Sequence, residues 1–135
     1  DLAGTLPRLR MVIINTPSNP TGYVITRTEQ EALLAFCRER GVYLLADEMY
    51  ERIVFRAEPP PSFLQLAPAA EELVTINGFS KAYAMTGWRL GYLIAQPPLA
   101  GRLAQMQEFV TSCAPAMAQV AAITALREGE PYVQK

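Results

Sequence analysis

Three short apolar runs, each stopping abruptly at a polar segment, are the feature that most constrains how this chain can fold. The runs cover residues 11–14, 42–46 and 73–76. They have the length and the aliphatic content of strands buried on both faces. Between the first two runs, Thr26 and Glu29 form a capping-box pattern and Gly41 is a C-cap signal, which predicts a helix. A strand, a helix and a strand at this spacing predict a right-handed βαβ unit in a parallel sheet.

The second half of the chain continues the alternation of strands and helices. Prolines 59–61 break the chain, and residues 62–72 predict a short helix or an irregular crossover. Residues 90–95 read as a fourth strand whose direction the sequence leaves open. An apolar stripe over residues 99–110 and a further pattern over residues 115–126 predict two helices. We expect the first stripe to serve core or subunit packing.

Composition excludes several classes of function. The chain has 135 residues, of which 50% are hydrophobic, so one domain with a sizeable core is expected. A net charge of −1 without a basic patch argues against nucleic-acid binding, and no apolar run is long enough to span a membrane. With no histidine, the chain itself holds no Ser-His-Asp triad and no histidine-based metal site, and no metal is predicted. Cys37 and Cys113 lie in apolar helical patterns, which predicts buried free thiols in a cytoplasmic protein.

The two ends suggest a piece of a larger protein. The sequence begins at Asp1 without methionine and stops at Lys135 without a cap or tail. Residues 1–135 are therefore expected to form a single partial domain.

Polar or glycine-bearing segments follow the first three predicted strands. These segments cover residues 15–22, 47–50 and 77–81. Ligands of open α/β sheets bind beyond the carboxyl ends of the strands, so the three segments should gather at one edge. The polar side chains expected to converge there are Asn19, Asp47, Tyr50, Ser80, Lys81 and Arg89.

The chemistry of this set points to one cofactor. Lys81 is the only lysine besides the terminal Lys135, although the chain has ten arginines. Lysine is an amine nucleophile whose natural partner is a carbonyl group, and Arg89 suits a phosphate. An aldehyde that carries a phosphate and a ring nitrogen describes pyridoxal 5′-phosphate (PLP). Lys81 would hold it as a Schiff base and carry protons, while Asp47 would face the ring nitrogen.

The same residues carry a resemblance to a known family. The matching motifs are Gly78-Phe79-Ser80-Lys81, Thr86-Gly87-Trp88-Arg89-Leu90-Gly91-Tyr92, Asn19-Pro20-Thr21-Gly22 and Asp47-Glu48-Met49-Tyr50. Their order and spacing resemble the class I/II, fold type I PLP-dependent aminotransferases. The resemblance implies a three-layer α/β/α fold with a mostly parallel sheet, in the central part of the aspartate aminotransferase-like large domain.

The resemblance also implies a function and a set of roles. The full-length enzyme would transfer an amino group from an amino acid to a 2-oxo acid through the Lys81 Schiff base, as a homodimer, whereas the isolated fragment would be inactive. Asn19 and Tyr50 would contact the ring hydroxyl, Asp47 the pyridine nitrogen and Arg89 the phosphate. Met49 would pack against one face of the ring.

One position departs from the family pattern, and two alternatives stay open. Many members have a serine that contacts the phosphate where this chain has Gly78, so Ser80 is the substitute donor. The sequence does not show whether the Asn19–Pro20 bond is cis. The alternatives are another fold type I PLP enzyme, such as an amino-acid lyase, and a non-enzymatic sensor domain of a transcription regulator.

Overall fold

A four-stranded, mostly parallel sheet forms the centre of the chain. The computed structural model describes residues 8–55, 61–70 and 72–134. The strands are β1 (Met11–Asn15), β2 (Tyr43–Asp47), β3 (Leu73–Gly78) and β4 (Gly91–Ala95), in the order β1-β2-β3-β4. β1, β2 and β3 are parallel, and β4 pairs antiparallel with β3. The predicted α/β class is confirmed, and the direction of the fourth strand, which the sequence left open, is antiparallel.

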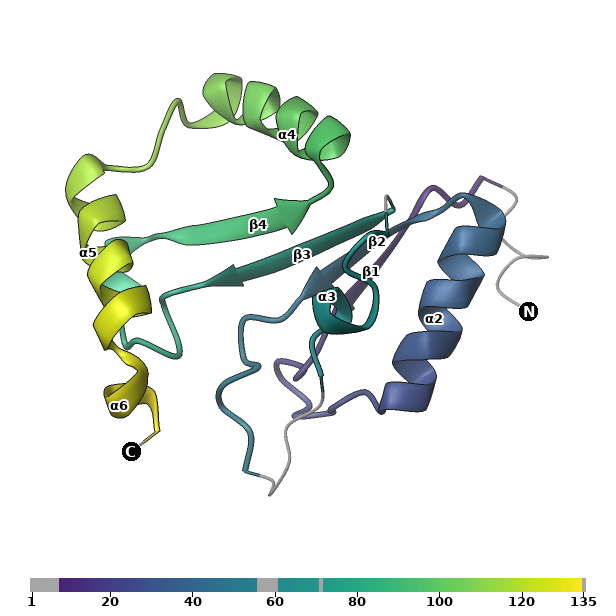
Figure 1. Ribbon diagram of the computed structural model, residues 1–135, viewed down its shortest axis with the longest axis horizontal. Coiled ribbons are helices and arrows are strands. Elements are labelled where there is room, and N and C mark those ends of the chain that lie inside the picture. The colour runs from purple at the N-terminus through teal and green to yellow at the C-terminus, as the bar shows by residue number, and fades with distance from the viewer. Residues whose placement is uncertain (1–7, 56–60, 71, 135) are drawn as a thin grey trace.

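Helices flank this sheet in two groups. They are α2 (Arg27–Arg40), α3 (Phe63–Leu66), α4 (Pro97–Val110), α5 (Ala116–Glu128) and α6 (Glu130–Val133), with a 3-10 turn at Thr86–Trp88. Figure 1 shows α2 on the β1 side of the sheet and α4, α5 and α6 on the β4 side. The short helix α3 contacts β3. The predicted crossover after the prolines is a short helix, although Pro59 and Pro60 lie outside the described residues.

The predicted caps set the bounds of α2. The Thr26 hydroxyl accepts a hydrogen bond from the Glu29 backbone amide at 3.3 Å, and the Thr26 amide donates to the Glu29 carboxylate at 2.8 Å. These two bonds satisfy donors that the first turn of a helix leaves free. At the other end, Gly41 has a φ of 60°, a left-handed conformation that glycine adopts without strain. The capping box and the glycine stop are confirmed.

The main core lies between α2, α3 and one face of the sheet. Leu44 from β2, Phe63 from α3 and Cys37 from α2 have no exposed surface, and Leu34 packs with them. Burying a side chain of the size of Leu44 or Phe63 contributes about 1.5–3 kcal/mol. The prediction that Cys37 is a buried free thiol is confirmed.

A second, smaller core holds residues 79–85, the segment that carries Lys81 (the Lys81 segment). Phe79 and Met85 are buried against Ala122 of α5, and Tyr83 and Leu90 pack around them. The Phe79 and Tyr83 rings lie 5.7 Å apart. The Lys81 segment is thus fixed to a helix that follows it in sequence.

The prediction that Cys113 is buried is wrong, whereas the prediction that its thiol is free is confirmed. Cys113 is a free and exposed thiol. The apolar pattern in the sequence continues to Cys113, but the helix α4 ends earlier, at Val110. Ser112, just before Cys113, adopts a φ of 59°. A left-handed residue cannot continue an α-helix. Cys113 therefore lies on the connection between α4 and α5.

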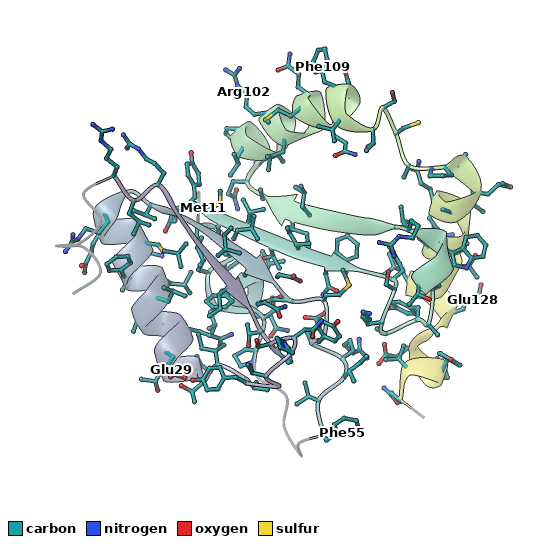
Figure 2. The ribbon with its side chains drawn as sticks, turned by 180° about the vertical axis from the view of Figure 1, so that it is seen from behind. Met11, Glu29, Phe55, Arg102, Phe109 and Glu128 are labelled. Carbon is teal, nitrogen blue, oxygen red and sulfur yellow. The ribbon has the colours of Figure 1, made fainter. Side chains whose placement is uncertain are left out.

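The C-terminal half of α4 exposes its apolar residues in this chain, whereas Leu99 and Leu103 are half-buried. Met106 is 62% exposed, Phe109 86% and Val110 72%. Figure 2 shows Phe109 on the outer side of the helix. None of the helices in the described residues is both long and apolar enough to cross a membrane.

Candidate functional site

The three polar segments meet at the carboxyl edge of the parallel strands. Asn15 at the end of β1 is the register partner of Asp47 at the end of β2, and Asp47 is the partner of Ile76 in β3. The pairing continues past the strands, because the Thr16 amide donates to the Asp47 carbonyl at 3.0 Å and the Glu48 amide donates to the Ile76 carbonyl at 2.9 Å. The segments after β1 and β2 therefore leave the sheet at the same level, as the sequence predicts.

Asn15 fixes the loop that carries Asn19. Its side-chain oxygen accepts from the Asn19 amide at 2.6 Å, and its Nδ2 donates to the Asp47 carbonyl at 3.2 Å. The peptide bonds before Pro17 and Pro20 are both cis. Gly22, with a φ of 70°, closes the turn by donating its amide to the Ser18 carbonyl at 2.8 Å. Sequence reasoning gave Asn15 no role, and its position at the end of a buried strand is the signal that was available.

Asn19 and Tyr50 form a direct pair across two loops. The Asn19 Nδ2 donates to the Tyr50 hydroxyl at 3.1 Å, although 31 residues separate them. A tyrosine hydroxyl that accepts one hydrogen bond keeps its own proton available for a further acceptor. This pair can therefore present a hydrogen-bond donor toward a ligand oxygen.

Lys81 approaches the same tyrosine from another side. Its Nζ lies 5.4 Å from the centroid of the Tyr50 ring, within the range of a cation–π contact. The Lys81 carbonyl accepts from the Ala84 amide at 3.2 Å, and the Phe79 carbonyl accepts from the Met85 amide at 3.2 Å. These turns return the chain toward the buried Phe79 and hold the half-buried lysine beside Tyr50.

Asp47 and Glu48 have different surroundings despite being neighbours. Asp47 is half-buried at the end of β2, and its Oδ1 accepts from the Met49 amide at 3.1 Å. Glu48 is only 3% exposed and accepts from the Ser62 hydroxyl at 2.5 Å and from the Phe63 amide at 2.7 Å. Burial raises the pKa of Glu48, and these two hydrogen bonds partly oppose the rise. Glu48 thus anchors the start of α3, and Asp47 remains the carboxylate at the strand edge.

A side chain at Gly78 would be crowded by its neighbours. A Cβ at this position would lie 3.0 Å from the Met49 Cε, 3.1 Å from the Gly91 Cα and 3.1 Å from the Leu90 carbonyl oxygen. Two of these three neighbours are backbone atoms, which cannot move aside as a flexible side chain can. The surroundings therefore favour the glycine that departs from the family pattern.

Ser80 and Arg89 are not joined to the other predicted residues by a hydrogen bond or an ion pair within the described part of the chain. Arg89 has a φ of 52° and donates from its Nη1 to the Thr86 carbonyl at 3.0 Å. The side chain is exposed, so its remaining donors face solvent. The direct contacts join Asn19, Tyr50 and Lys81, while Asp47 shares the strand edge with them.

A cavity borders this cluster. It has a volume of about 400 Å³, and Asn19, Pro20, Tyr50, Ile53 and Phe55 are among its lining residues. Figure 2 shows Phe55 at the tip of its loop. Asn19 and Tyr50 line the cavity, whereas Lys81 and Asp47 do not.

Comparison with known families and proteins gives a consistent result. The family model described as aminotransferase class I and II matches residues 3–134. The chain is 39% identical over 126 residues to an aspartate aminotransferase of Thermotoga maritima, a match that covers 93% of this chain and 33% of the relative. It is 40% identical over 122 residues to aromatic-amino-acid aminotransferase 2 of Thermococcus litoralis, covering 90% of this chain and 31% of the relative.

Solved structures give the same result for the fold. A crystal structure of aspartate aminotransferase from Thermotoga maritima superposes with a TM-score of 0.87 at 37% identity, over 99% of this chain and 37% of that one. A Thermus thermophilus aspartate aminotransferase mutant complexed with tryptophan superposes with a TM-score of 0.87 at 34% identity, over 95% and 34% of the two chains. The present chain thus spans about a third of the length of the proteins it matches.

Proposed function

The chain belongs to the class I and II aminotransferases, and on this premise we propose that the full-length protein is a PLP-dependent enzyme that transfers an amino group from an amino acid to a 2-oxo acid. Residues 1–135 are the central part of its cofactor-binding large domain, and the protein acts in the cytoplasm. The observation that carries the proposal is the convergence of Asn19 and Lys81 on Tyr50, at 3.1 Å and 5.4 Å respectively.

The residues present fit the proposed cofactor. PLP offers an aldehyde, a ring hydroxyl, a ring nitrogen and a phosphate, and the strand edge offers a complement to each. Lys81 is an amine held beside an aromatic ring, the Asn19–Tyr50 pair presents hydrogen-bond donors, and Asp47 is a carboxylate at the end of β2. The exposed Arg89 guanidinium has donors left for a phosphate.

Each residue then has a task that its chemistry supports. Lys81 would supply the primary amine that attaches the cofactor, and its Nζ would hold and move a proton. Asp47 keeps the ring nitrogen protonated through its negative charge. Asn19 and Tyr50 donate to the ring oxygen and stabilise its negative charge. When bound, PLP supplies an electron sink for the bonds broken at the substrate's α-carbon.

An absorbance experiment on the full-length protein tests the cofactor assignment. Addition of PLP is expected to produce the band of a lysine-bound cofactor, Lys81→Ala is expected to abolish it, and Lys135→Ala is the matched control that should retain it. An unchanged band in Lys81→Ala would overturn the proposal.

The reaction type is tested separately. Incubation with an amino acid and a 2-oxo acid is expected to yield the exchanged pair. Release of ammonia without transfer would identify a lyase instead, and binding without turnover would favour a sensor.

The homodimer is also a proposal. The outward stripe of Met106, Phe109 and Val110 on α4 offers apolar surface of the kind that subunits bury. Sedimentation of the full-length protein is expected to give twice the monomer mass, and a monomer at micromolar concentration would contradict this.

A further inference from the structure

We propose that Glu51 is a positioning residue for Lys81, and that it acts through the side chain of Asn77. The proposal rests on the role given to Lys81 above. Glu51 follows Tyr50 on the turn after β2, whereas Asn77 is part of β3 and precedes the Lys81 segment. The two residues are 26 positions apart in sequence.

Asn77 is the link between the two segments. Its Nδ2 donates to the Glu51 Oε1 at 2.7 Å, and its Oδ1 accepts from the Gly78 amide at 2.8 Å. The asparagine is only 8% exposed, so water competes little for either bond. One carboxamide therefore ties the turn that carries Tyr50 to the backbone that leads into Lys81.

The partners dictate which way the amide points. A carboxylate only accepts hydrogen bonds and a backbone amide only donates, so Nδ2 must face Glu51 and Oδ1 must face Gly78. A hydrogen bond to an ionised carboxylate is about twice as strong as a neutral one. Because Gly78 has no side chain, its position depends on such backbone contacts.

The same turn also reaches the far end of the Lys81 segment. Arg52 forms an ion pair with Glu130 of α6. Next to Glu130, a Cβ on Gly129 would lie 2.9 Å from the ring of Tyr83, so Tyr83 is in close contact with this glycine. The turn is therefore connected to the start of the Lys81 segment by Asn77. It is connected to the end of that segment by α6, whose neighbour Gly129 contacts Tyr83. These connections fix the position of Lys81 relative to Tyr50.

A swap of the two polar groups tests the inference in the full-length protein. Asn77→Asp sets two carboxylates against each other at the 2.7 Å contact. The double variant Glu51→Gln/Asn77→Asp restores the bond with reversed polarity, because the new amide at 51 donates to the new carboxylate at 77. The second oxygen of that carboxylate still accepts from the Gly78 amide.

Two readouts report the position of Lys81 without measuring turnover. The first is the rate at which an amine-acylating reagent labels Lys81 in the cofactor-free protein, followed by mass spectrometry with Lys135 as the internal reference. The second is the intensity of the absorbance band after addition of PLP.

Asn77→Asp is expected to speed the labelling of Lys81 by about tenfold and to weaken the band, since a displacement of about 1 Å is enough to disturb such a site. The double variant is expected to return both readouts to within about threefold of the wild type. Thermal midpoints show that each variant is folded, and Glu51→Ala, which removes the acceptor without adding charge, is the second variant if Asn77→Asp does not fold.

The failure of this inference differs from that of the proposed function. Wild-type labelling and an unchanged band in Asn77→Asp, or no recovery in the double variant, would overturn the positioning role while Lys81→Ala still loses the band. A band that survives Lys81→Ala would instead remove the proposed function and the inference with it.

Discussion

Gly78 and Gly91 are register partners in the antiparallel pair of β3 and β4, and they approach so closely that a Cβ on Gly78 would lie 3.1 Å from the Gly91 Cα. This contact lies at the point where the sheet turns into the Lys81 segment. A serine at position 78, which the family pattern leads one to expect, would crowd these neighbours. If a hydroxyl of this segment contacts a phosphate, Ser80 is the residue placed to supply it.

Gly78→Ala is expected to destabilise the protein. The added methyl group meets the Leu90 carbonyl and the Gly91 Cα, and overpacking of this kind costs about 1–3 kcal/mol of unfolding free energy. Urea unfolding measures the change. The matched control is Gly101→Ala in α4, where no atom lies within 4 Å, and there a gain of about 0.5–1 kcal/mol is expected. Equal effects of the two substitutions would contradict the steric explanation.

Glu48 is expected to make the protein less stable as the pH rises. Burial raises the pKa of Glu48 above its ordinary value of 4.5, so the folded protein holds this proton more tightly than the unfolded chain does. Its contribution to the unfolding free energy is therefore greatest below pH 4.5 and declines as the pH rises through the raised pKa.

Glu48→Gln removes this titration and isolates its effect. Urea unfolding from about pH 4 to about pH 7 is expected to show the wild type losing stability relative to the variant. If the stability of the wild type relative to Glu48→Gln stayed constant or increased with pH, the pKa of Glu48 would not be raised in the folded protein.

Glu29 is expected to show the opposite dependence on pH. The Thr26 hydroxyl, which donates to its carboxylate at 2.7 Å, is the main cause that lowers the pKa of Glu29 below 4.5. Its stabilisation is present above pH 4.5 and is lost as the pH falls through the lowered pKa. In a urea series extended to pH values below the lowered pKa, the advantage of the wild type over Glu29→Gln should shrink toward acid. An advantage that persists below both pKa values would contradict the assignment.

Local patterns predicted the elements but not the contacts between them. The capping box of Thr26 and Glu29 and the stop at Gly41 depend on a few neighbouring residues, so the sequence was sufficient for α2. The direction of β4 depends on its pairing with β3, which periodicity does not encode. Cys113 was placed wrongly because an apolar stripe continues past the residue where the backbone leaves the helix.

In the candidate site, too, the residue types could be predicted from the sequence, whereas the contacts between distant segments could not. The sequence indicated which residue types gather at the strand edge, because the ends of parallel strands share that edge. It did not indicate that Asn77 pairs with Glu51 or that Glu48 is buried beneath α3. These contacts join segments far apart in the chain, and the side chains involved are equally common on a protein surface.

Tyr50→Phe is expected to separate the two contacts that meet at Tyr50. The substitution keeps the ring beside Lys81 but removes the hydroxyl that accepts from the Asn19 Nδ2 at 3.1 Å. Loss of a buried or ligand-facing hydrogen bond to a charged group costs about 1.5–3 kcal/mol, which corresponds to a fall in turnover of about tenfold to a hundredfold. The absorbance band of the lysine-bound cofactor should persist, because Lys81 is untouched. Tyr43→Phe, at an exposed position of β2, is the matched control and should change neither quantity. If Tyr50→Phe turned over at the wild-type rate, the hydroxyl would have no part in holding the ring oxygen.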